Sequence, residues 1–461
     1  MTHSAIRTIP LGLIFAGVAL GVGAGLSVAA PVSFIAVGVA IIATVIVFAR
    51  TRARSEFVVS AYWITFCLFS TMLADSVIPG QFYPFYGALV LGAVVALAVG
   101  GLRVDAVVVW VYVAFLFLIL VSLLGYTEPI APERLIVVPF GALVLLQFRS
   151  SVGLRTVAFA ALTASLAVSI WVIVMAIQGD FAYRANIDVN QNVVSVYIGL
   201  GFMTALAERA HGYRGRRGGL ATLLLVLALA VMAYALVLLA SRGMITALLL
   251  ASLALFIRVA ATDRRQLRFF LVLLVVSALG LLLPGGTGIF TRLDEPNTLT
   301  GGGRVEIWAA IGEELTKSSP KELLIGHGFE SSQRVVQRRI ATLTSAHNAY
   351  LQVFFDYGVL GLALFLALHG HAIARSWAIR GRDGALILGL VTFLLGGNLF
   401  MTTPDNFMYW TALGFALAIG AWHGADADIG GLTPRDGVLQ PVTPSRDHGP
   451  TGDEGNHAQA R

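Results

Sequence analysis

The sequence predicts an all-α integral membrane protein, and three observations lead to that prediction. Of the 461 residues, 57% are hydrophobic and only 12% are charged, whereas about a quarter of the residues in an average soluble domain are charged. Apolar runs of about 17–25 residues, the length that a helix needs to cross a bilayer, recur along the chain. The loops between them alternate between arginine-rich and arginine-poor, which is typical of a multi-pass protein.

The apolar runs predict roughly fourteen membrane helices, and because several runs are short we expect about twelve to fourteen. The first run is expected to remain as a helix, since no small-residue cleavage site of a signal peptide follows it. The expected spans are residues 9–29, 31–49, 57–73, 85–101, 104–124, 134–148, 155–177, 192–207, 220–240, 244–261, 269–284, 350–368, 384–401 and 409–423.

The arginines predict which side of the membrane each loop faces. With the N-terminus in the cytoplasm, the arginine-poor loops 75–84 and 126–133 fall on the outer face. The net charge of +6 is carried by short loops, so nucleic acid is not an expected partner. The arginine-rich loops, which we expect in the cytoplasm, are 50–54, 149–155, 208–217, 258–268 and 375–382.

These patterns divide the chain into four parts. A transmembrane bundle is expected over 1–284, a large extracytoplasmic loop over 285–349 and C-terminal transmembrane helices over 350–423. The remainder, 424–461, is rich in glycine, proline and aspartate and is expected to be a disordered cytoplasmic tail. No internal repeat is apparent.

The large loop is predicted to hold two short amphipathic helices. In "RVEIWAAIGEEL" apolar residues recur at helical spacing, and "SSP" at 318–320 is expected to end that helix. A second helical stretch, "SSQRVVQRRIATL", covers 331–343. The apolar face of the first helix is expected to consist of Val305, Trp308, Ile311 and Leu315.

Two arginines on the predicted outer face need an explanation. Arg242 lies in "ASRG", between two apolar runs with almost no loop, and Arg304 lies in "TGGGRVEIW" at a helix start. A guanidinium near a membrane boundary must snorkel, pair or bind a ligand. An interfacial anchor or a solvated helix end is one interpretation. The other is an anion clamp, because arginine keeps its charge and matches phosphate with a forked set of donors.

A histidine closes the large loop in "SAHNAYL". His347 precedes a helix, so it is either a polar neighbour of the helix cap or a group for general acid–base chemistry near neutral pH. Asn348 can orient a neighbouring group or a substrate hydroxyl. Asp356, a candidate substrate-binding residue, follows about 13 Å deeper along a straight helix, where a carboxylate should face the protein interior or a wet cavity.

The remaining polar residues give weaker indications of a functional site. Arg184, in "QGDFAYRANIDVNQN", is a candidate substrate-binding residue, although a polar turn is the simpler interpretation. His327 lies between glycines in "IGHGF" and is expected to belong to a turn. The sequence contains no His-x-x-x-His pair or cysteine cluster that predicts a metal site, and no cofactor is expected.

Taken in order, "ASRG", "TGGGRVEIW", "LLIGHGF" and "HNAYLQVFFDYGVLGL" resemble the O-antigen ligase and polymerase superfamily of bacterial envelope glycosyltransferases. The resemblance is sharpest over about 190–365. It implies a glycosyltransferase C-like membrane fold and a donor glycan linked to a polyprenyl diphosphate such as undecaprenyl diphosphate. In that family the residues that match Arg242 and Arg304 hold the diphosphate, and the residue that matches His347 activates the acceptor hydroxyl.

The resemblance implies transfer of a lipid-linked glycan, without a metal, to an acceptor on the outer face of the cytoplasmic (inner) membrane. The acceptor would be a glycan, a lipid or a wall component. Attack of a hydroxyl on the anomeric carbon would invert its configuration. Two alternatives stay open: a polymerase that joins lipid-linked repeat units, and a membrane transporter. Transporters of this size often show internal repeats and charges at mid-membrane, whereas here the polar residues gather at one face.

Overall fold

A computed structural model describes residues 105–123, 151–177, 191–210, 218–239, 241–262, 304–340, 346–379, 381–401, 409–410 and 412–421. Every regular element in these ranges is an α-helix, which confirms the predicted all-α class. The expected spans at 9–29, 31–49, 57–73, 85–101, 134–148 and 269–284, and the tail from 424, lie outside the described residues.

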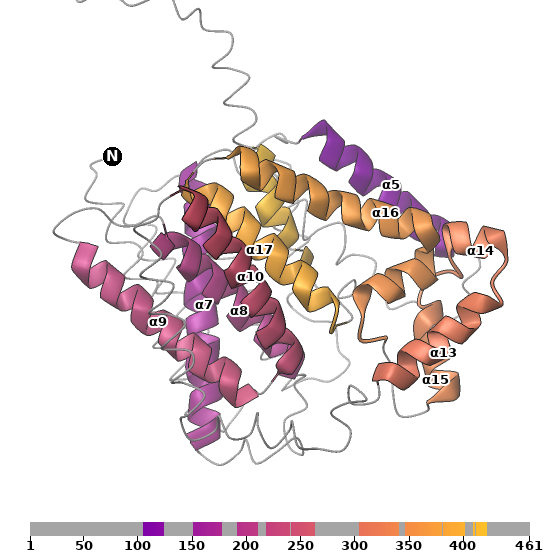
Figure 1. The fold of residues 1–461 in the computed structure, drawn as a ribbon, viewed down its shortest axis with the longest axis horizontal. Helices are drawn as coiled ribbons and strands as arrows, with labels where there is room; N and C mark the ends of the chain where they lie inside the picture. The colour runs from indigo at the N-terminus through magenta and orange to yellow at the C-terminus, as the bar shows by residue number, and fades with distance from the viewer. Residues whose placement is uncertain are drawn as a thin grey trace, which may run out of the picture. The chain divides into compact units, whose positions relative to one another are not determined.

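The helices agree with the predicted runs to within a few residues, except where noted below (Figure 1). Their bounds are α5 Ala106–Leu123, α7 Ser151–Ile177, α8 Gln191–Ala210, α9 Gly218–Leu239, α10 Arg242–Thr262, α13 Arg304–Thr316, α14 Pro320–Ile325, α15 Ser331–Arg339, α16 Ala349–Ala378 and α17 Arg382–Asn398. A further short apolar helix covers Ala412–Ala421.

The described part of the chain contains helices suited to a bilayer. Four segments are long and apolar enough to cross it, namely Ala106–Leu123, Thr222–Leu239, Gly243–Ala261 and Ala349–Ala378. The α-helix is one of the few structures that satisfy the hydrogen bonds of every backbone group inside lipid. The chain is therefore an all-α integral membrane protein, and the total of about twelve to fourteen spans remains a prediction.

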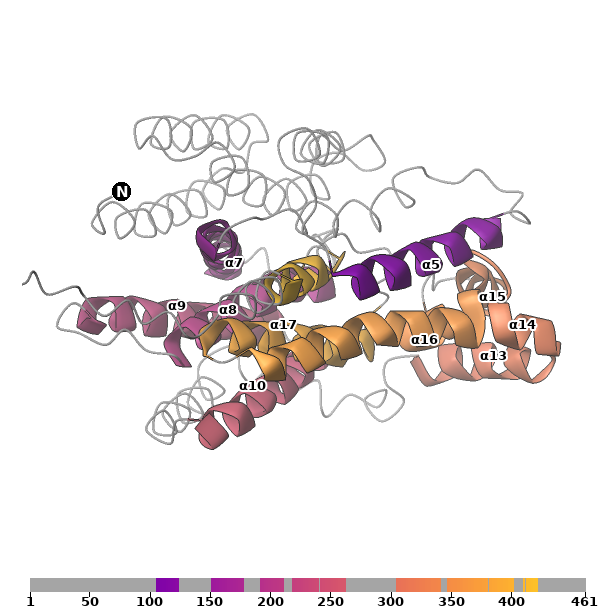
Figure 2. The ribbon, with the colours of Figure 1, turned by 90° about the horizontal axis from the view of Figure 1, so that it is seen from above.

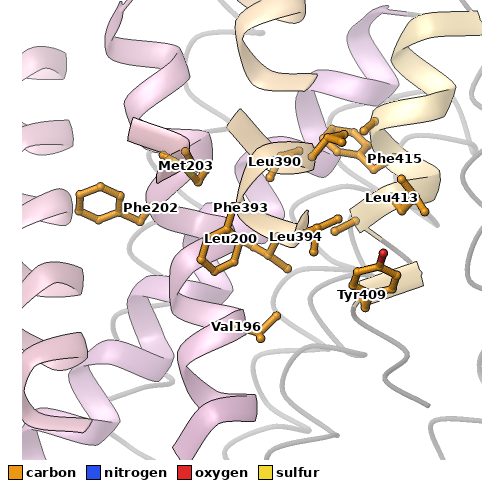
Figure 3. Close-up of a cluster of buried hydrophobic side chains, with 14 of the residues drawn as sticks. Val196, Leu200, Phe202, Met203, Leu390, Phe393, Leu394, Tyr409, Leu413 and Phe415 are labelled. Atoms are coloured by element: carbon orange, nitrogen blue, oxygen red, sulfur yellow. The ribbon is translucent and has the colours of Figure 1, made fainter. Parts of the chain in front are cut away.

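Helix α17 lies at the centre of the described bundle and contacts α8, α10 and α16 (Figures 1 and 2). Its side chains are buried on nearly all sides, as expected for a helix that is apolar all round. Leu390, Phe393 and Leu394 of α17 pack into the hydrophobic core shown in Figure 3. Gly396 brings the α17 backbone so close to α10 that an added Cβ would lie 2.9 Å from the Cα of Ala247. Small residues permit this kind of approach between membrane helices.

Helices α13, α14 and α15 form a second unit, the α13–α15 module (residues 304–340), around the beginning of α16 (Figure 2). It has a small hydrophobic core of its own, to which Ile307 and Ile311 of α13, Val336 of α15 and Phe355 of α16 contribute. The side chains of these residues are at most 1% exposed. The module is thus held to α16 by apolar burial, which is the main favourable term in packing.

Two expectations about this module were wrong. Helix α14 was missed, although Ser319 and Glu322 form a capping box and Pro320 opens the helix, a recognised start signal. Val305 was expected on the apolar face, but its side chain is 51% exposed, and Ile307 takes the central position. Trp308, Ile311 and Leu315 do pack against the module core as predicted.

Helix α16 is longer than the predicted span 350–368 and is kinked. Gly358 has φ +69° and ψ −168°, outside the helical region. Because only glycine adopts such a backbone readily, the kink is encoded at this position. The part before Gly358 is about 13 Å long and the part after it about 30 Å, which is the thickness of the hydrocarbon core. The first part packs in the module core, so we infer that the membrane span begins after the kink.

The predicted cytoplasmic loop 375–382 is much shorter than expected. Helix α16 continues to Ala378 and α17 begins at Arg382, so most of the loop is helical. Arg375 is part of the helix and donates to Asp105 at 2.6 Å, which joins the end of α16 to the start of α5. Arg258, expected in the loop 258–268, lies inside α10 and donates to the carbonyl of Ile379. Both arginines stabilise helix ends, a role that the loop prediction did not include.

The kink gives a testable prediction. A Cβ at position 358 would collide with the carbonyl of Leu324 and lie 2.6 Å from the nitrogen of Gly326. Gly358→Ala should therefore lower stability by at least about 2 kcal/mol, from backbone strain and overpacking together. The thermal midpoint in detergent measures this. Gly370→Ala, on the same helix with nothing within 4 Å of its Cβ, is the matched control. Equal midpoints for the two variants would contradict the packing described.

Candidate functional site

Four chain segments meet at the candidate site: the starts of α10, α13 and α16 and the residues that follow α17. Arg242 is the first residue of α10, Arg304 is the first residue of α13, and His347 lies just before α16. The contacts below connect these segments through Phe400, Trp308 and the module core. The structure thus brings together elements that are far apart in the sequence.

His347 is held in an uncommon backbone conformation. Its φ is +47°, in the left-handed region that few non-glycine residues occupy. Asn348 follows as the N-cap of α16, and its Oδ1 accepts from the Leu351 N–H at 3.0 Å. Outliers of this kind persist only where the surroundings fix them and are frequent at functional sites. The cap explains one side-chain contact of Asn348, and its expected contact with substrate remains a prediction.

Trp308 fixes the residue that precedes His347. Its indole N–H donates to the carbonyl of Ala346 at 3.0 Å, and Ala346 is completely buried. Trp308 lies one helical turn after Arg304, so both side chains lie on one side of α13. A single helix therefore supplies a positive charge and the hydrogen bond that anchors the turn at His347. The sequence identified Trp308 only as an apolar residue, and its indole N–H was the signal missed.

The charge of Arg304 acts on His347. The pKa of His347 is lowered from its ordinary value, first by burial and then by the positive charge of Arg304. Both effects disfavour the imidazolium form. A largely neutral imidazole at physiological pH can accept a proton. The structure therefore places an imidazole and a permanent cation in one environment.

The position of Arg242 in the candidate site is set by the backbone at the start of α10. The hydroxyl of the preceding residue, Ser241, donates to Asn192 Oδ1 at 2.7 Å, which ties this start to α8. The orientation of the Arg242 side chain lies outside what the structure describes. The small residues Ser241 and Gly243 predict room for a ligand beside Arg242, but the space at Gly243 is filled: a Cβ there would lie 2.6 Å from Cγ of Phe400. The ring of Phe400 is in turn 5.9 Å from the guanidinium carbon of Arg304.

Asp356 performs a structural task that the sequence did not predict. Its carboxylate is 1% exposed and Oδ1 accepts from the Ser332 N–H at 2.8 Å and the Ser331 hydroxyl at 3.1 Å. These residues begin α15, whose own N-cap residue, Glu330, makes no side-chain cap. A carboxylate at a helix N-terminus is favoured by the helix dipole. Asp356 therefore caps α15 from α16, facing the interior as expected of a buried acid.

The remaining candidates lie apart from this centre. His327 belongs to a turn, as expected. Its backbone N–H donates to the Phe355 carbonyl at 2.9 Å, and its imidazole ring stacks on the ring of Phe355 with centroids 4.3 Å apart. Arg184 lies outside the described residues. Within the described ranges no group of three His, Cys, Asp or Glu side chains is placed to hold a metal ion. Metal independence itself stays a prediction.

The segment that contains the candidate site is similar to known proteins. A family model described as O-antigen ligase matches residues 227–366. The chain is also 29% identical over 192 residues to an O-antigen ligase of Pseudomonas aeruginosa strain PAO1, an alignment that covers 40% of this chain and 45% of the relative. The predicted resemblance to the O-antigen ligase superfamily is confirmed. The alignment spans less than half of the relative's length.

The matched segment contains most of the predicted site and leaves part of its support outside. Arg242, Arg304, His347 and Asp356 all lie within 227–366. Phe400 lies beyond it. Helix α10, the α13–α15 module and the kinked start of α16 all lie within the segment that the O-antigen ligase family model covers.

A buried polar network beside the site escaped the sequence analysis. Asn398, 0% exposed at the end of α17, donates to the Tyr409 hydroxyl at 3.0 Å, and Tyr409 also hydrogen-bonds His369 of α16. Tyr350, one turn after His347, donates to the Leu395 carbonyl at 2.7 Å. Polar side chains inside apolar helices are costly unless paired, so their presence in apolar runs was the available signal. Here they join α16 to α17.

The role assigned to Asp356 can be tested. Asp356→Ala should lower stability by about 1–3 kcal/mol, because buried donors of Ser331 and Ser332 lose their acceptor. Asp356→Asn keeps an acceptor oxygen but loses the charge at the helix start, and should cost about 1 kcal/mol. Thermal midpoints measure both, with exposed Glu306→Gln on α13 as the control. Unchanged midpoints with loss of activity would instead assign Asp356 to substrate binding.

Proposed function

We propose that this chain is a membrane glycosyltransferase of the O-antigen ligase type. It would transfer a glycan from a polyprenyl diphosphate to a hydroxyl of an acceptor glycan, lipid or wall component outside the cytoplasmic membrane. The observation that carries the proposal is the charge of Arg304 acting on the partly buried imidazole of His347. The similarity of residues 227–366 to O-antigen ligases supports the same reaction.

The reaction needs a base and a stabiliser of negative charge. In the proposed step the acceptor oxygen attacks the anomeric carbon, and a new glycosidic bond forms there. The bond from that carbon to the diphosphate oxygen breaks, and the polyprenyl diphosphate leaves with the electron pair. The acceptor proton passes to His347. Direct displacement of this kind inverts the anomeric configuration.

Arginine suits the leaving group. The departing diphosphate gains negative charge, which fixed cations stabilise most in a site that excludes water. Arg304 and Arg242 keep their charge at any physiological pH and can bind phosphate oxygens in pairs. Arg304 has a second effect: after burial, its charge is the next cause that lowers the pKa of His347 and so favours the neutral imidazole, which can accept a proton.

The kink in α16 supports a location at the membrane surface. If the span begins after Gly358, the module and His347 lie just outside the hydrocarbon core. A polyprenyl tail could then stay in lipid while its diphosphate reaches Arg304. The arginine distribution predicts that this surface is the outer face of the cytoplasmic membrane, with both termini in the cytoplasm. No nucleotide sugar is present there, so a lipid-linked donor fits the location.

The product distinguishes the possible reactions. Both similarities described above are to ligases, which favours transfer to a different molecule. Purified protein should be incubated with a polyprenyl-diphosphate oligosaccharide and a candidate acceptor, and the products identified by mass. Glycan on the acceptor supports ligation, whereas a lengthened lipid-linked chain would establish a polymerase. Flux of the lipid-linked glycan across vesicles without a covalent product would establish a transporter.

Single replacements of the three central residues should stop the reaction. Arg242→Ala and Arg304→Ala should each lower kcat by about 10²–10³-fold through lost charge stabilisation. His347→Ala should lower it by about 10²–10⁴-fold through loss of the base. Transfer rates measured at equal amounts of inserted protein test this. Arg338→Ala, an exposed arginine on α15, is the control and should keep full activity. Full activity of His347→Ala would exclude it as the base.

The pH dependence of kcat/KM should reflect the lowered pKa of His347. A base acts only when neutral, so activity should be level at neutral pH and fall as pH drops through the pKa of His347. Because that pKa is lowered, the fall should occur below about 6.5, the ordinary value of an imidazole. A pH–rate profile with the midpoint of its acid limb above that value would contradict the assignment.

A further inference from the structure

Phe400 lies where the starts of α10 and α13 approach each other, outside the segment that the O-antigen ligase model matches. It follows α17 by two residues, and its backbone N–H donates to the carbonyl of Gly397 at 2.9 Å. Its side chain is partly buried. The contacts on two sides of its ring indicate what it does.

On one side Phe400 packs directly on the backbone of α10. Gly243, which follows Arg242, has no side chain, and a Cβ added there would overlap Cβ of Phe400 and lie 2.6 Å from its Cγ. The glycine of the "SRG" element therefore makes room for this ring. The close packing fixes the distance between the start of α10 and the segment after α17.

On the other side Phe400 faces Arg304. The guanidinium carbon of Arg304 is 5.9 Å from the ring centroid, within the range of a cation–π interaction. Since Arg304 is the first residue of α13, this contact connects that helix start to the ring and, through the ring, to the residue beside Arg242. One aromatic side chain thus contacts both arginine-bearing segments.

The segment that carries Phe400 is itself fixed. Asn398, two residues earlier, is fully buried and donates to the Tyr409 hydroxyl at 3.0 Å. One turn before that, the Leu395 carbonyl accepts from the Tyr350 hydroxyl of α16 at 2.7 Å. These hydrogen bonds hold the end of α17, so the ring has a defined position from which to orient Arg304.

We propose that Phe400 is a positioning residue that holds the guanidinium of Arg304 beside the start of α10, so that Arg304 and Arg242 bind one diphosphate together. This inference rests on the proposed function, because it assigns the two arginines to a common diphosphate. Phe400 touches no reacting atom in this account. It acts through Arg304 on the donor diphosphate, both when the donor binds and when the diphosphate departs, and the acceptor site is unaffected.

The test compares leucine and tyrosine at this position. Phe400→Leu keeps apolar volume but removes the aromatic face, and Phe400→Tyr keeps the face. Binding of farnesyl diphosphate to the full-length protein in detergent is the first readout, since it needs no turnover. Phe400→Leu should weaken binding by about 3–30-fold, the range of a cation–π interaction, while Phe400→Tyr stays within about twofold of the unmodified protein. In transfer assays Phe400→Leu should raise KM for the donor and leave KM for the acceptor unchanged.

A second variant approaches the same contact from α10. Gly243→Ala should displace the ring of Phe400 and weaken farnesyl diphosphate binding as much as Phe400→Leu does. If Phe400→Leu does not fold, the binding result of Gly243→Ala tests the role of Phe400 instead. Unweakened binding in both variants would overturn the inference, as would equal loss in Phe400→Tyr and Phe400→Leu. If the unmodified protein binds the diphosphate but makes no glycan product, the proposed function fails and the binding comparison still tests Phe400. If it makes product and Phe400→Leu binds normally, the inference alone fails.

Discussion

The packing of α13 against the first two turns of α16 is the interaction on which the rest of the site depends. Ile307 and Ile311 bury their side chains against Phe355 and Val336, and Trp308 hydrogen-bonds the carbonyl just before His347. This contact sets Arg304 near the imidazole, keeps the left-handed backbone at His347 and closes the module core. Apolar burial stabilises the packing of α13 on α16, and the indole hydrogen bond of Trp308 fixes the position of α13 relative to the residue before His347.

The membrane helices position this contact from the other side. Helix α17 is buried among α8, α10 and α16, and the polar network of Asn398, Tyr409 and His369 fixes its end. At the kink at Gly358, helix α16 changes direction, and the part before the kink packs in the module core. The candidate site therefore combines the helix bundle, which carries Arg242 and Phe400, with the α13–α15 module, which carries Arg304. His347 lies between the two, where burial is the main cause that lowers its pKa and the charge of Arg304 is the second.

Local patterns in the sequence predicted the helices well and their long-range contacts poorly. The run 104–124 became α5 with nearly the same bounds, because length and apolarity alone decide a membrane helix. The roles of Gly358, Gly243 and Asp356 depend on partners distant in the chain: Leu324 and Gly326, Phe400, and the start of α15. No periodicity reveals such partners. Helix α14, in contrast, was signalled by its capping box and was missed because the helix is so short.

The candidate residues Arg304 and His347 were predicted from type and position, but their proximity could not be. Measuring the pKa of His347 tests that proximity most directly, by NMR on protein in detergent with isotope-labelled histidine, its signal assigned with His347→Asn. Replacing Arg304 by glutamine removes a positive charge and should raise the pKa of His347, whereas Arg338→Gln should leave it unchanged. An unchanged or lowered pKa in Arg304→Gln would contradict the claim that the two side chains form one site.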